Sequence, residues 1–226
     1  MRCQNLLRGV IFRLAKSGDF FHNFASTFDT LYDNQRKPLM RWFDRRFRSD
    51  MFIRFARTFE ILEPWTGKSV LDIGCGSGPY VLEAFRRGAS QVTAVDPAAN
   101  MLSLVKKRLE DTPYSHRCLI IQGAVPQVLV EPHDYVIVMG VLDYIADAST
   151  FLQAIRRMTK EICVMSFPSR HWLRSTLRKT RYLLRNCPVY FYDQPLIREW
   201  CSKAGFAEIE IFKIPGAGMD YHVTLR

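Results

Sequence analysis

The pattern of apolar positions changes near residue 65 of the 226-residue chain. Before that point, and most clearly over residues 39–62, apolar side chains recur at helical spacing. From Lys68 onward, short apolar runs alternate with helical patterns, which is typical of parallel β-α-β units. We therefore predict an N-terminal helical cap over residues 1–64 and an α/β domain over residues 65–226.

The order of strands and helices in the second region predicts a mostly parallel sheet. We expect strands at residues 69–73, 91–95, 118–122, 134–139, 161–166, 207–213 and 219–225. We expect helices at residues 79–87, 98–110, 149–158 and 194–204. Only residues 215–218, which read PGAG, separate the last two strands, so these strands should form a hairpin with one of them antiparallel to its neighbours. A basic, aromatic segment at residues 167–193 interrupts the alternation and is interpreted as an insertion.

A glycine turn between the first strand and its helix carries the strongest chemical signal. Residues 70–78 read VLDIGCGSG, and the next strand ends on Asp96. Glycines in such a turn let the backbone approach a nucleoside closely, and an acid at the second strand end accepts from ribose hydroxyls. Dinucleotide binders favour G-x-G-x-x-G, with a pyrophosphate at the helix N-terminus. The charge of Asp72 would repel a pyrophosphate and attract a cationic amino-acid group.

This arrangement of an acid, G-x-G-x-G and a second acid resembles the class I S-adenosylmethionine-dependent methyltransferases. The resemblance covers about residues 65–225 and implies a Rossmann-like fold, mostly parallel with an antiparallel C-terminal strand. It also implies S-adenosyl-L-methionine as the cofactor. The alternative for Asp96 is a strand-end acid that caps the next helix. The residues implied for cofactor binding are Asp72, Gly74, Cys75, Gly76, Gly78, Asp96, Pro97, Met101, Gly123, Ala124, Val125 and Met139.

The segments after the third and fourth expected strands differ from the family pattern or leave the role of a residue undecided. Many members carry an acid where this chain has Ala124, so the adenine would be held by backbone groups or by Gln122. The segment after the fourth strand lacks an Asn-Pro-Pro-Tyr motif, which argues against N-methylation of a nucleobase. A hydroxyl acceptor would benefit from a general base. Candidate bases, each with a structural alternative, are Asp143, Tyr144, Tyr32, His22, His171 and His222.

The net charge of +10 bears on the acceptor. Basic residues concentrate in residues 36–57 and 170–185, where they would serve as solvated helix faces or steer an anionic substrate, a membrane surface or a nucleic acid. We expect O-methylation of a small anionic molecule, at a hydroxyl or a carboxylate. The layout is loosely similar to magnesium-protoporphyrin O-methyltransferases, which methylate a propionate. The alternative is an RNA-associated or non-catalytic protein, but aromatic residues at helical spacing favour core packing over base stacking.

The cysteines and the chain start bear on location. The six cysteines include no C-x-x-C pair, so we expect neither a metal site nor a disulfide framework, and reduced thiols in the cytoplasm. Residues 1–13 are basic and amphipathic and lack the apolar core of a signal peptide. No apolar run reaches the roughly 18 residues that a membrane span requires.

Overall fold

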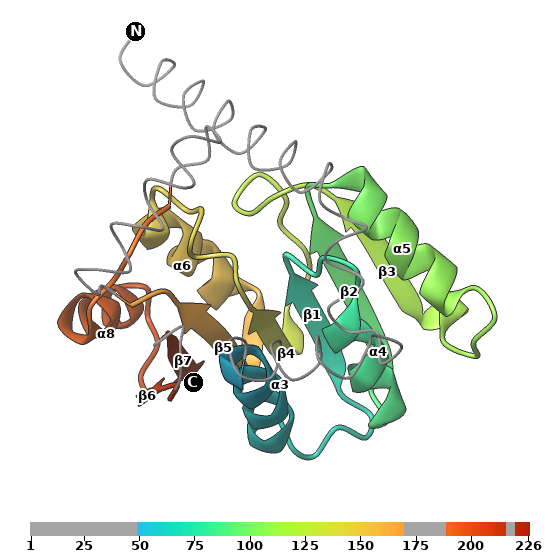
Figure 1. Ribbon diagram of the computed structural model, residues 1–226, viewed down its shortest axis with the longest axis horizontal. Helices are drawn as coiled ribbons and strands as arrows, with labels where there is room; N and C mark the ends of the chain where they lie inside the picture. Colours follow the sequence, from blue (N-terminus) through green and yellow to red (C-terminus); the bar gives the residue numbers. More distant parts are fainter. Residues whose placement is uncertain (1–48, 170–188, 216–219) are drawn as a thin grey trace, which may run out of the picture.

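The computed structural model describes residues 49–169, 189–215 and 220–226 (Figure 1). Most of the predicted cap and most of the predicted insertion therefore lie outside the described residues. The same holds for three candidate bases, namely His22, Tyr32 and His171, and for the basic residues of segments 36–48 and 170–185. Among the helices that the structure describes, none combines the length and the hydropathy that crossing a membrane demands.

A seven-stranded sheet with the order β3-β2-β1-β4-β5-β7-β6 forms the centre of the described fold (Figure 1). Its strands are β1 (Ser69–Ile73), β2 (Gln91–Asp96), β3 (Cys118–Gln122), β4 (His133–Val138), β5 (Thr159–Phe167), β6 (Ile209–Lys213) and β7 (Tyr221–Leu225). Strand β7 runs antiparallel to both β5 and β6, and the pairs among β1 to β5 are parallel. The predicted α/β class, the C-terminal hairpin and the reversed C-terminal strand are confirmed. The reversed strand lies between β5 and β6, so β6 forms the sheet edge.

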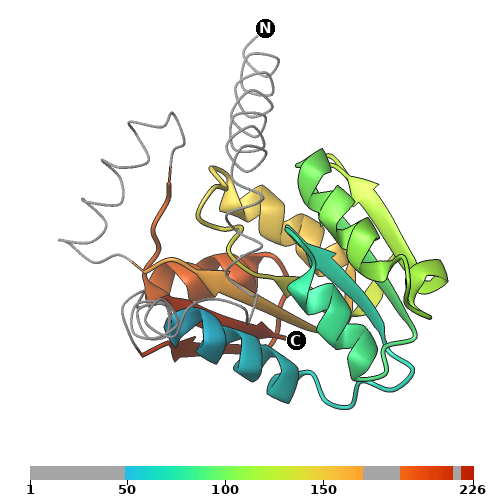
Figure 2. The ribbon, with the colours of Figure 1, turned by 45° about the vertical axis from the view of Figure 1, so that its right-hand side comes forward.

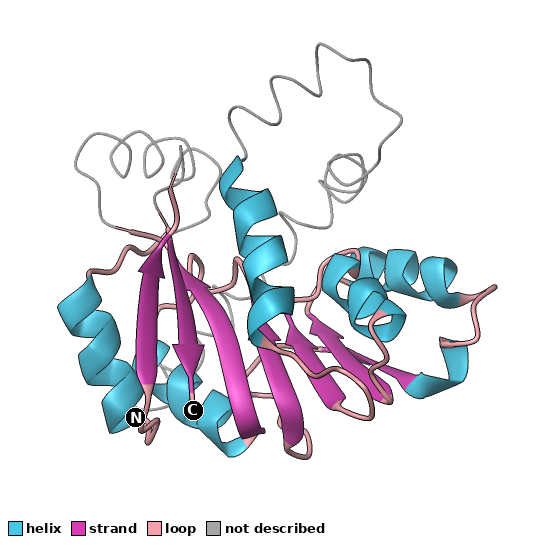
Figure 3. Cartoon of the chain, turned by 90° about the horizontal axis from the view of Figure 1, so that it is seen from below, coloured by secondary structure: helices cyan, strands magenta, loops and turns pink. Residues whose placement is uncertain are grey.

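Helices cover both faces of the sheet (Figure 3). They are α3 (Ser49–Ile61), α4 (Pro79–Arg86), α5 (Ala99–Leu109), α6 (Ala148–Arg157) and α8 (Gln194–Lys203), with a short 3₁₀ turn at Ser115–Arg117. Alternate side chains of each strand point to opposite faces. Val70 accordingly packs with residues of α3, α4 and α5, whereas Leu71 and Ile73 pack with residues of α6 and α8.

Local chemistry explains where several helices begin. Asp147 and Asp193 accept hydrogen bonds from the backbone N–H groups of Thr150 and Leu196, at the starts of α6 and α8. Helix α4 begins at Pro79, where the missing N–H would have no partner within the helix. These signals are local in sequence, which is why the helix positions are predictable from it.

Helix α3 packs directly on the sheet, although its residues fall in the segment predicted as a cap (Figure 2). Phe59 is fully buried, and its ring stacks on Tyr80 with the centroids 5.7 Å apart. Phe55 lies against the same two rings. The indole N–H of Trp65 donates to the Phe59 carbonyl at 3.1 Å, which ties the end of α3 to the start of the α/β region. These aromatic rings serve the core, as their helical spacing suggests.

Candidate functional site

Four loops leave the parallel strands at the same edge of the sheet, because the carboxyl ends of parallel strands meet there. The loops follow β1, β2, β3 and β4. The first three are joined by backbone hydrogen bonds, from Gly74 N–H to the Val95 carbonyl at 2.7 Å and from Gly123 N–H to the Asp96 carbonyl at 3.0 Å. A ligand at this edge would therefore meet a connected frame of backbone.

The glycines of the first loop differ in what surrounds them. Gly76 has φ +53°, and a Cβ built on it would project into open space, since apart from its chain neighbours no described residue has an atom within 4 Å. A Cβ on Gly74 would collide with the Val141 side chain, and one on Gly78 would lie 3.0 Å from Val105 Cγ2. Gly74 and Gly78 thus permit close packing. Gly76 lines an open space at the sheet edge, as a close approach by a ligand requires.

Asp96 connects this open space to the start of α5. Its Oδ2 accepts from the Gly76 N–H at 2.9 Å, and its Oδ1 accepts from the Ala98 N–H at 2.8 Å. Burial raises the pKa of the carboxyl, and the two hydrogen bonds oppose that rise. A carboxylate offers about four acceptor positions, so these bonds leave capacity for hydroxyl donors. Asp96 thus does cap the next helix, as the alternative for this residue proposed. This role leaves acceptor positions for the two hydroxyls of a diol.

Asp72 is a buried carboxyl in the same site. Only 2% of it is exposed, and among the described residues its Oδ2 has no hydrogen-bond partner. Burial, together with the nearby charge of Asp96, raises the pKa of Asp72 to about 8. A buried carboxyl without a partner is costly to ionise unless a cation or donor lies beside it. The site therefore fits a ligand with a positively charged group close to Asp72.

Replacing Asp72 with asparagine is expected to change how stability depends on pH. The unfolded chain releases this proton near pH 4, and the folded chain releases it near pH 8. Between these values the folded state holds the extra proton, so stability falls as pH rises, by about 1.4 kcal/mol per pH unit. Urea unfolding of wild type should thus show a loss of roughly 3 kcal/mol between pH 5 and 7 that Asp72→Asn lacks.

Asp134 offers a matched control at the opposite edge of the sheet. Its Oδ2 accepts from the Ser69 N–H and hydroxyl, and these bonds lower the pKa of Asp134 despite the opposing effect of burial. Its contribution to stability is lost as pH falls, so Asp134→Asn should destabilise the protein at neutral pH. If Asp72→Asn instead behaved like Asp134→Asn, a raised pKa at Asp72 would be contradicted.

The residues predicted for the adenine side lie at the ends of β2 and β3. Pairing of Asp96 with Gln122 aligns the two strand ends. The side-chain amide of Gln122 donates to the Pro97 carbonyl at 3.4 Å, and Pro97 is exposed. The other predicted residues differ in exposure, with Gly123 and Ala124 half-buried and Met101 and Val125 buried.

The side chains of Met101 and Cys75 pack against other protein side chains. Met101 packs with Ala98 and Leu104 beneath the start of α5. The Cys75 side chain is buried in the cluster that includes Phe59 and Tyr80, and its backbone N–H donates to the Val95 carbonyl. The Cys75 side chain therefore contributes to the core beneath the turn.

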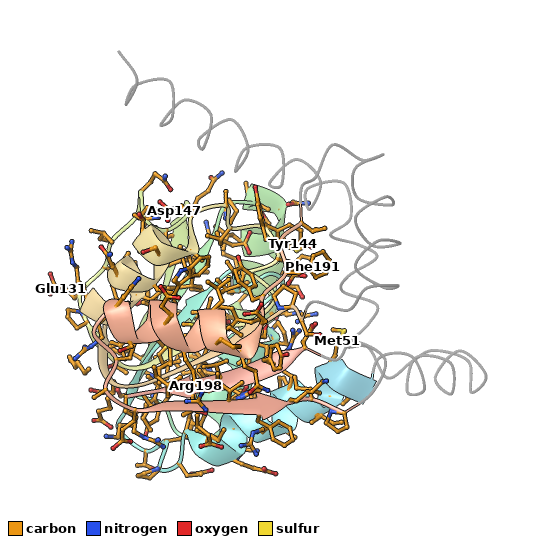
Figure 4. The ribbon with its side chains drawn as sticks, turned by 90° about the vertical axis from the view of Figure 1, so that its left-hand side faces the viewer. Met51, Glu131, Tyr144, Asp147, Phe191 and Arg198 are labelled. Atoms are coloured by element: carbon orange, nitrogen blue, oxygen red, sulfur yellow. The ribbon has the colours of Figure 1, made fainter. Side chains whose placement is uncertain are left out.

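The loop after β4 is held by a segment far along the chain. The hydroxyl of the buried Tyr192 is directed at the Leu142 and Ile145 carbonyl oxygens, each 3.1 Å away. The backbone N–H of Tyr190 donates to the Asp143 carbonyl at 2.9 Å. Figure 4 accordingly shows Tyr144 and Phe191 in one region of the molecule. Sequence separation hides this contact, and no signal in the sequence could have revealed it.

The candidates after β4 differ in accessibility. Met139 and Asp143 are buried, with 8% and 4% of their surfaces exposed, and Tyr144 is half-buried. Gly140 follows Met139 in this loop, and its N–H donates to the Ser166 hydroxyl oxygen at 2.8 Å. This contact joins the carboxyl ends of β4 and β5.

His222 is unsuitable as a base for an acceptor. It is fully buried in β7, with its Nε2 3.2 Å from the Thr58 hydroxyl oxygen of α3. Burial, and then the charges of Arg57 and Arg54, lower the pKa of His222 to about 3. The imidazole is therefore a neutral core group that links α3 to the sheet.

Arg54 belongs to this edge, although the sequence shows it only as one of several basic residues. Its Nη1 donates to the Ser166 hydroxyl oxygen at 3.3 Å. A Cβ built on Gly140 would lie 4.0 Å from both Nη1 and Nη2 of Arg54.

In the described parts of the chain, no three His, Cys, Asp or Glu side chains are placed to hold a metal ion.

A family model described as a methyltransferase domain matches residues 70–161. Two relatives are ubiquinone biosynthesis O-methyltransferases. The protein from Bradyrhizobium sp. (strain ORS 278) is 32% identical over 141 residues, which are 60% of this chain and 54% of that protein. The protein from Nitrobacter winogradskyi is 32% identical over 157 residues, which are 67% of this chain and 58% of that protein. This chain thus matches little more than half the length of these relatives.

A solved structure extends the likeness of the fold beyond the matched domain. Magnesium protoporphyrin IX methyltransferase from Synechocystis PCC 6803, a structure with bound SAH, aligns with a TM-score of 0.70 and 19% identity. The alignment covers 89% of this chain and 95% of that one. The solved structure shows a likeness of the fold, and the matched domain together with the two relatives identifies the α/β region as a class I S-adenosylmethionine-dependent methyltransferase domain.

Proposed function

We propose that this protein transfers a methyl group from S-adenosyl-L-methionine to an oxygen of a small, anionic acceptor. The main support for the cofactor site is the position of Asp96. Its carboxylate accepts hydrogen bonds from Gly76 and from Ala98, the residue before α5, beside the open space at Gly76. A ribose diol would donate to the remaining acceptor positions of this carboxylate. The matched methyltransferase domain includes both residues and supports the same cofactor.

The residues around this space suit the other parts of the cofactor. When bound, S-adenosylmethionine supplies an electrophilic methyl group on a positively charged sulfur. Asp72, buried and with one oxygen lacking a partner among the described residues, would bind the cationic amino-acid portion. Met101, Val125 and the backbone of Gly123 and Ala124 would border the adenine. Displacement at a sulfonium needs alignment above all, so the chain contributes mainly orientation.

The acceptor would lie at the loop after β4, on the far side of Gly74 from Asp96. For a hydroxyl acceptor, Asp143 or Tyr144 of this loop would receive the proton. A carboxylate acceptor is already ionised and needs no base. Transfer to oxygen is supported by the relatives that are named O-methyltransferases, and the anionic class by the net charge of +10.

Two segments around the sheet also belong to the proposed site. We retain the proposal that residues 1–64 act as a cap and that residues 167–193 form a basic insertion, and that both shape the acceptor pocket. Peripheral contact with a membrane and a cytoplasmic location also stay predictions. The N-terminal helix of the described region, α3, would contribute one wall through Arg54.

The activity is tested by incubating the protein with methyl-labelled S-adenosylmethionine and an extract of small metabolites, followed by mass spectrometry. One compound should gain a single labelled methyl group, and none should with Asp96→Ala. Alkaline hydrolysis then distinguishes the two acceptor classes, because it cleaves a methyl ester and leaves a methyl ether intact. Binding of the cofactor without label transfer to any small molecule would contradict the proposed acceptor class.

A further inference from the structure

The second half of helix α5 contacts the glycine turn that follows β1. The Cγ2 atom of Val105 lies 3.0 Å from the Cβ position of Gly78. Three residues later, Arg108 Nη1 donates to the Ser77 carbonyl oxygen at 3.0 Å. Ser77 is 2% exposed and Arg108 is half-buried, so this hydrogen bond is partly shielded from solvent.

The peptide unit between Ser77 and Gly78 is held at both of its polar groups. Arg108 donates to its carbonyl oxygen, and its N–H, which belongs to Gly78, donates to the Cys75 carbonyl oxygen at 3.0 Å. Glycines with φ +53° and +82° flank Ser77, and glycine restricts backbone rotation less than any other residue. The conformation of residues 76–78 therefore depends on these hydrogen bonds more than on steric restriction by side chains.

We propose that Arg108 is a positioning residue for S-adenosylmethionine, which acts by holding the glycine turn in the conformation that binds the cofactor. This inference rests on the proposed function. Without the guanidinium, the Ser77 carbonyl would lose a charge-assisted hydrogen bond in a buried place, and the peptide unit would rotate toward water. Only molecules that keep the original turn would then bind, so the apparent affinity would fall in proportion to their share.

An effect of the charge of Arg108 on the ligand is separable from this positioning role. S-adenosylmethionine carries one more positive charge than S-adenosylhomocysteine, because its sulfur is a sulfonium. If Arg108 acted through its charge, its removal would relieve repulsion and favour S-adenosylmethionine over S-adenosylhomocysteine. If Arg108 holds the turn, its removal weakens the binding of both ligands by the same factor.

Arg156 offers a matched control in the last turn of α6. Its Nε donates to the Gly205 carbonyl oxygen at 3.0 Å, and its Nη1 donates to the Thr159 carbonyl oxygen at 3.1 Å. Like Arg108 it is half-buried, but its partners lie before β5 and after α8, at the edge of the sheet opposite the glycine turn. Arg156→Met therefore removes a guanidinium and its bonds to backbone carbonyls without a contact to the cofactor site.

The test measures the affinity for S-adenosylhomocysteine and for S-adenosylmethionine by isothermal titration calorimetry, well below the unfolding transition of each protein. Arg108→Met should bind both ligands about tenfold more weakly than wild type, as expected if about one molecule in ten keeps the binding conformation. Arg108→Lys, which keeps a donor on a shorter side chain, should have an intermediate affinity. Arg156→Met should lose thermal stability and keep the wild-type affinity.

Amide hydrogen exchange of the ligand-free proteins, followed by NMR, examines the turn itself. The amide protons of Gly76 and Gly78 should exchange faster in Arg108→Met than in wild type, and at the wild-type rate in Arg156→Met. Wild-type affinity or wild-type exchange at both glycines in Arg108→Met would overturn the inference. An equal affinity loss in Arg156→Met, or a loss confined to one of the two ligands, would also overturn it. Wild type that binds neither ligand would instead count against the proposed function.

Discussion

Replacing Gly76 with valine is expected to abolish binding of S-adenosylmethionine. Gly76 lines the open space beside Asp96, and within the described part of the chain its Cβ position has no neighbour closer than 4 Å other than the adjoining residues. A valine side chain would occupy this space and would also strain a backbone with φ +53°. We expect the affinity to fall at least about 100-fold, which is roughly 2.7 kcal/mol. Calorimetric titration with the cofactor measures the change.

Gly67 supplies the control for backbone strain. It has φ +80°, and its Cβ position is likewise free of atoms of other described residues within 4 Å, its chain neighbours aside. It lies before β1, at the amino edge of the sheet, and its N–H donates to the Gly88 carbonyl. Gly67→Val should therefore lose stability without losing cofactor affinity. Equal affinity losses in the two variants would attribute the effect to a general distortion rather than to a filled site.

Replacing Asp96 with alanine should have an effect of similar size on cofactor binding. The variant loses the acceptor proposed for the ribose and also the two hydrogen bonds that join Gly76 to Ala98. Hydrogen bonds to a charged group contribute about 1.5–3 kcal/mol each, so we expect at least about a 100-fold loss of affinity. Titration calorimetry with S-adenosylmethionine and with S-adenosylhomocysteine checks this result.

Asp134→Ala provides the comparison for Asp96→Ala. Asp134 also accepts two hydrogen bonds, both from Ser69, but at the amino edge of the sheet. Its loss should lower the thermal midpoint and leave the cofactor affinity unchanged. An Asp96→Ala protein that retained wild-type affinity would remove Asp96 from the site.

The sequence was sufficient for the elements because their signals are local. Strand alternation, Pro79 at the start of α4 and the capping acids Asp147 and Asp193 all act within a few residues. The predicted ends of the strands and helices consequently agree with the structure to within two residues. The glycine turn and Asp96 were predictable for the same reason, since a strand, a turn and a helix fix their geometry together.

The remaining features depend on contacts between distant segments. Arg54 and Ser166 are 112 residues apart, and Tyr192 contacts the loop after β4 across 50 residues. Periodicity identifies the inner face of α3, but it does not tell which part of the sheet that face meets. His222 was a candidate base because the sequence does not show what packs over β7. Burial beneath α3 makes its imidazole a neutral core group.

The most direct measurement is a crystal structure of the protein with S-adenosylhomocysteine. We expect both ribose hydroxyls within hydrogen-bond distance of the Asp96 carboxylate, about 2.5–3.0 Å between oxygens. We also expect the amino-acid portion beside Asp72 and the sulfur directed toward the loop after β4. A ligand bound elsewhere, or an Asp96 side chain that makes no contact with the ribose, would contradict the assignment of this sheet edge as the cofactor site.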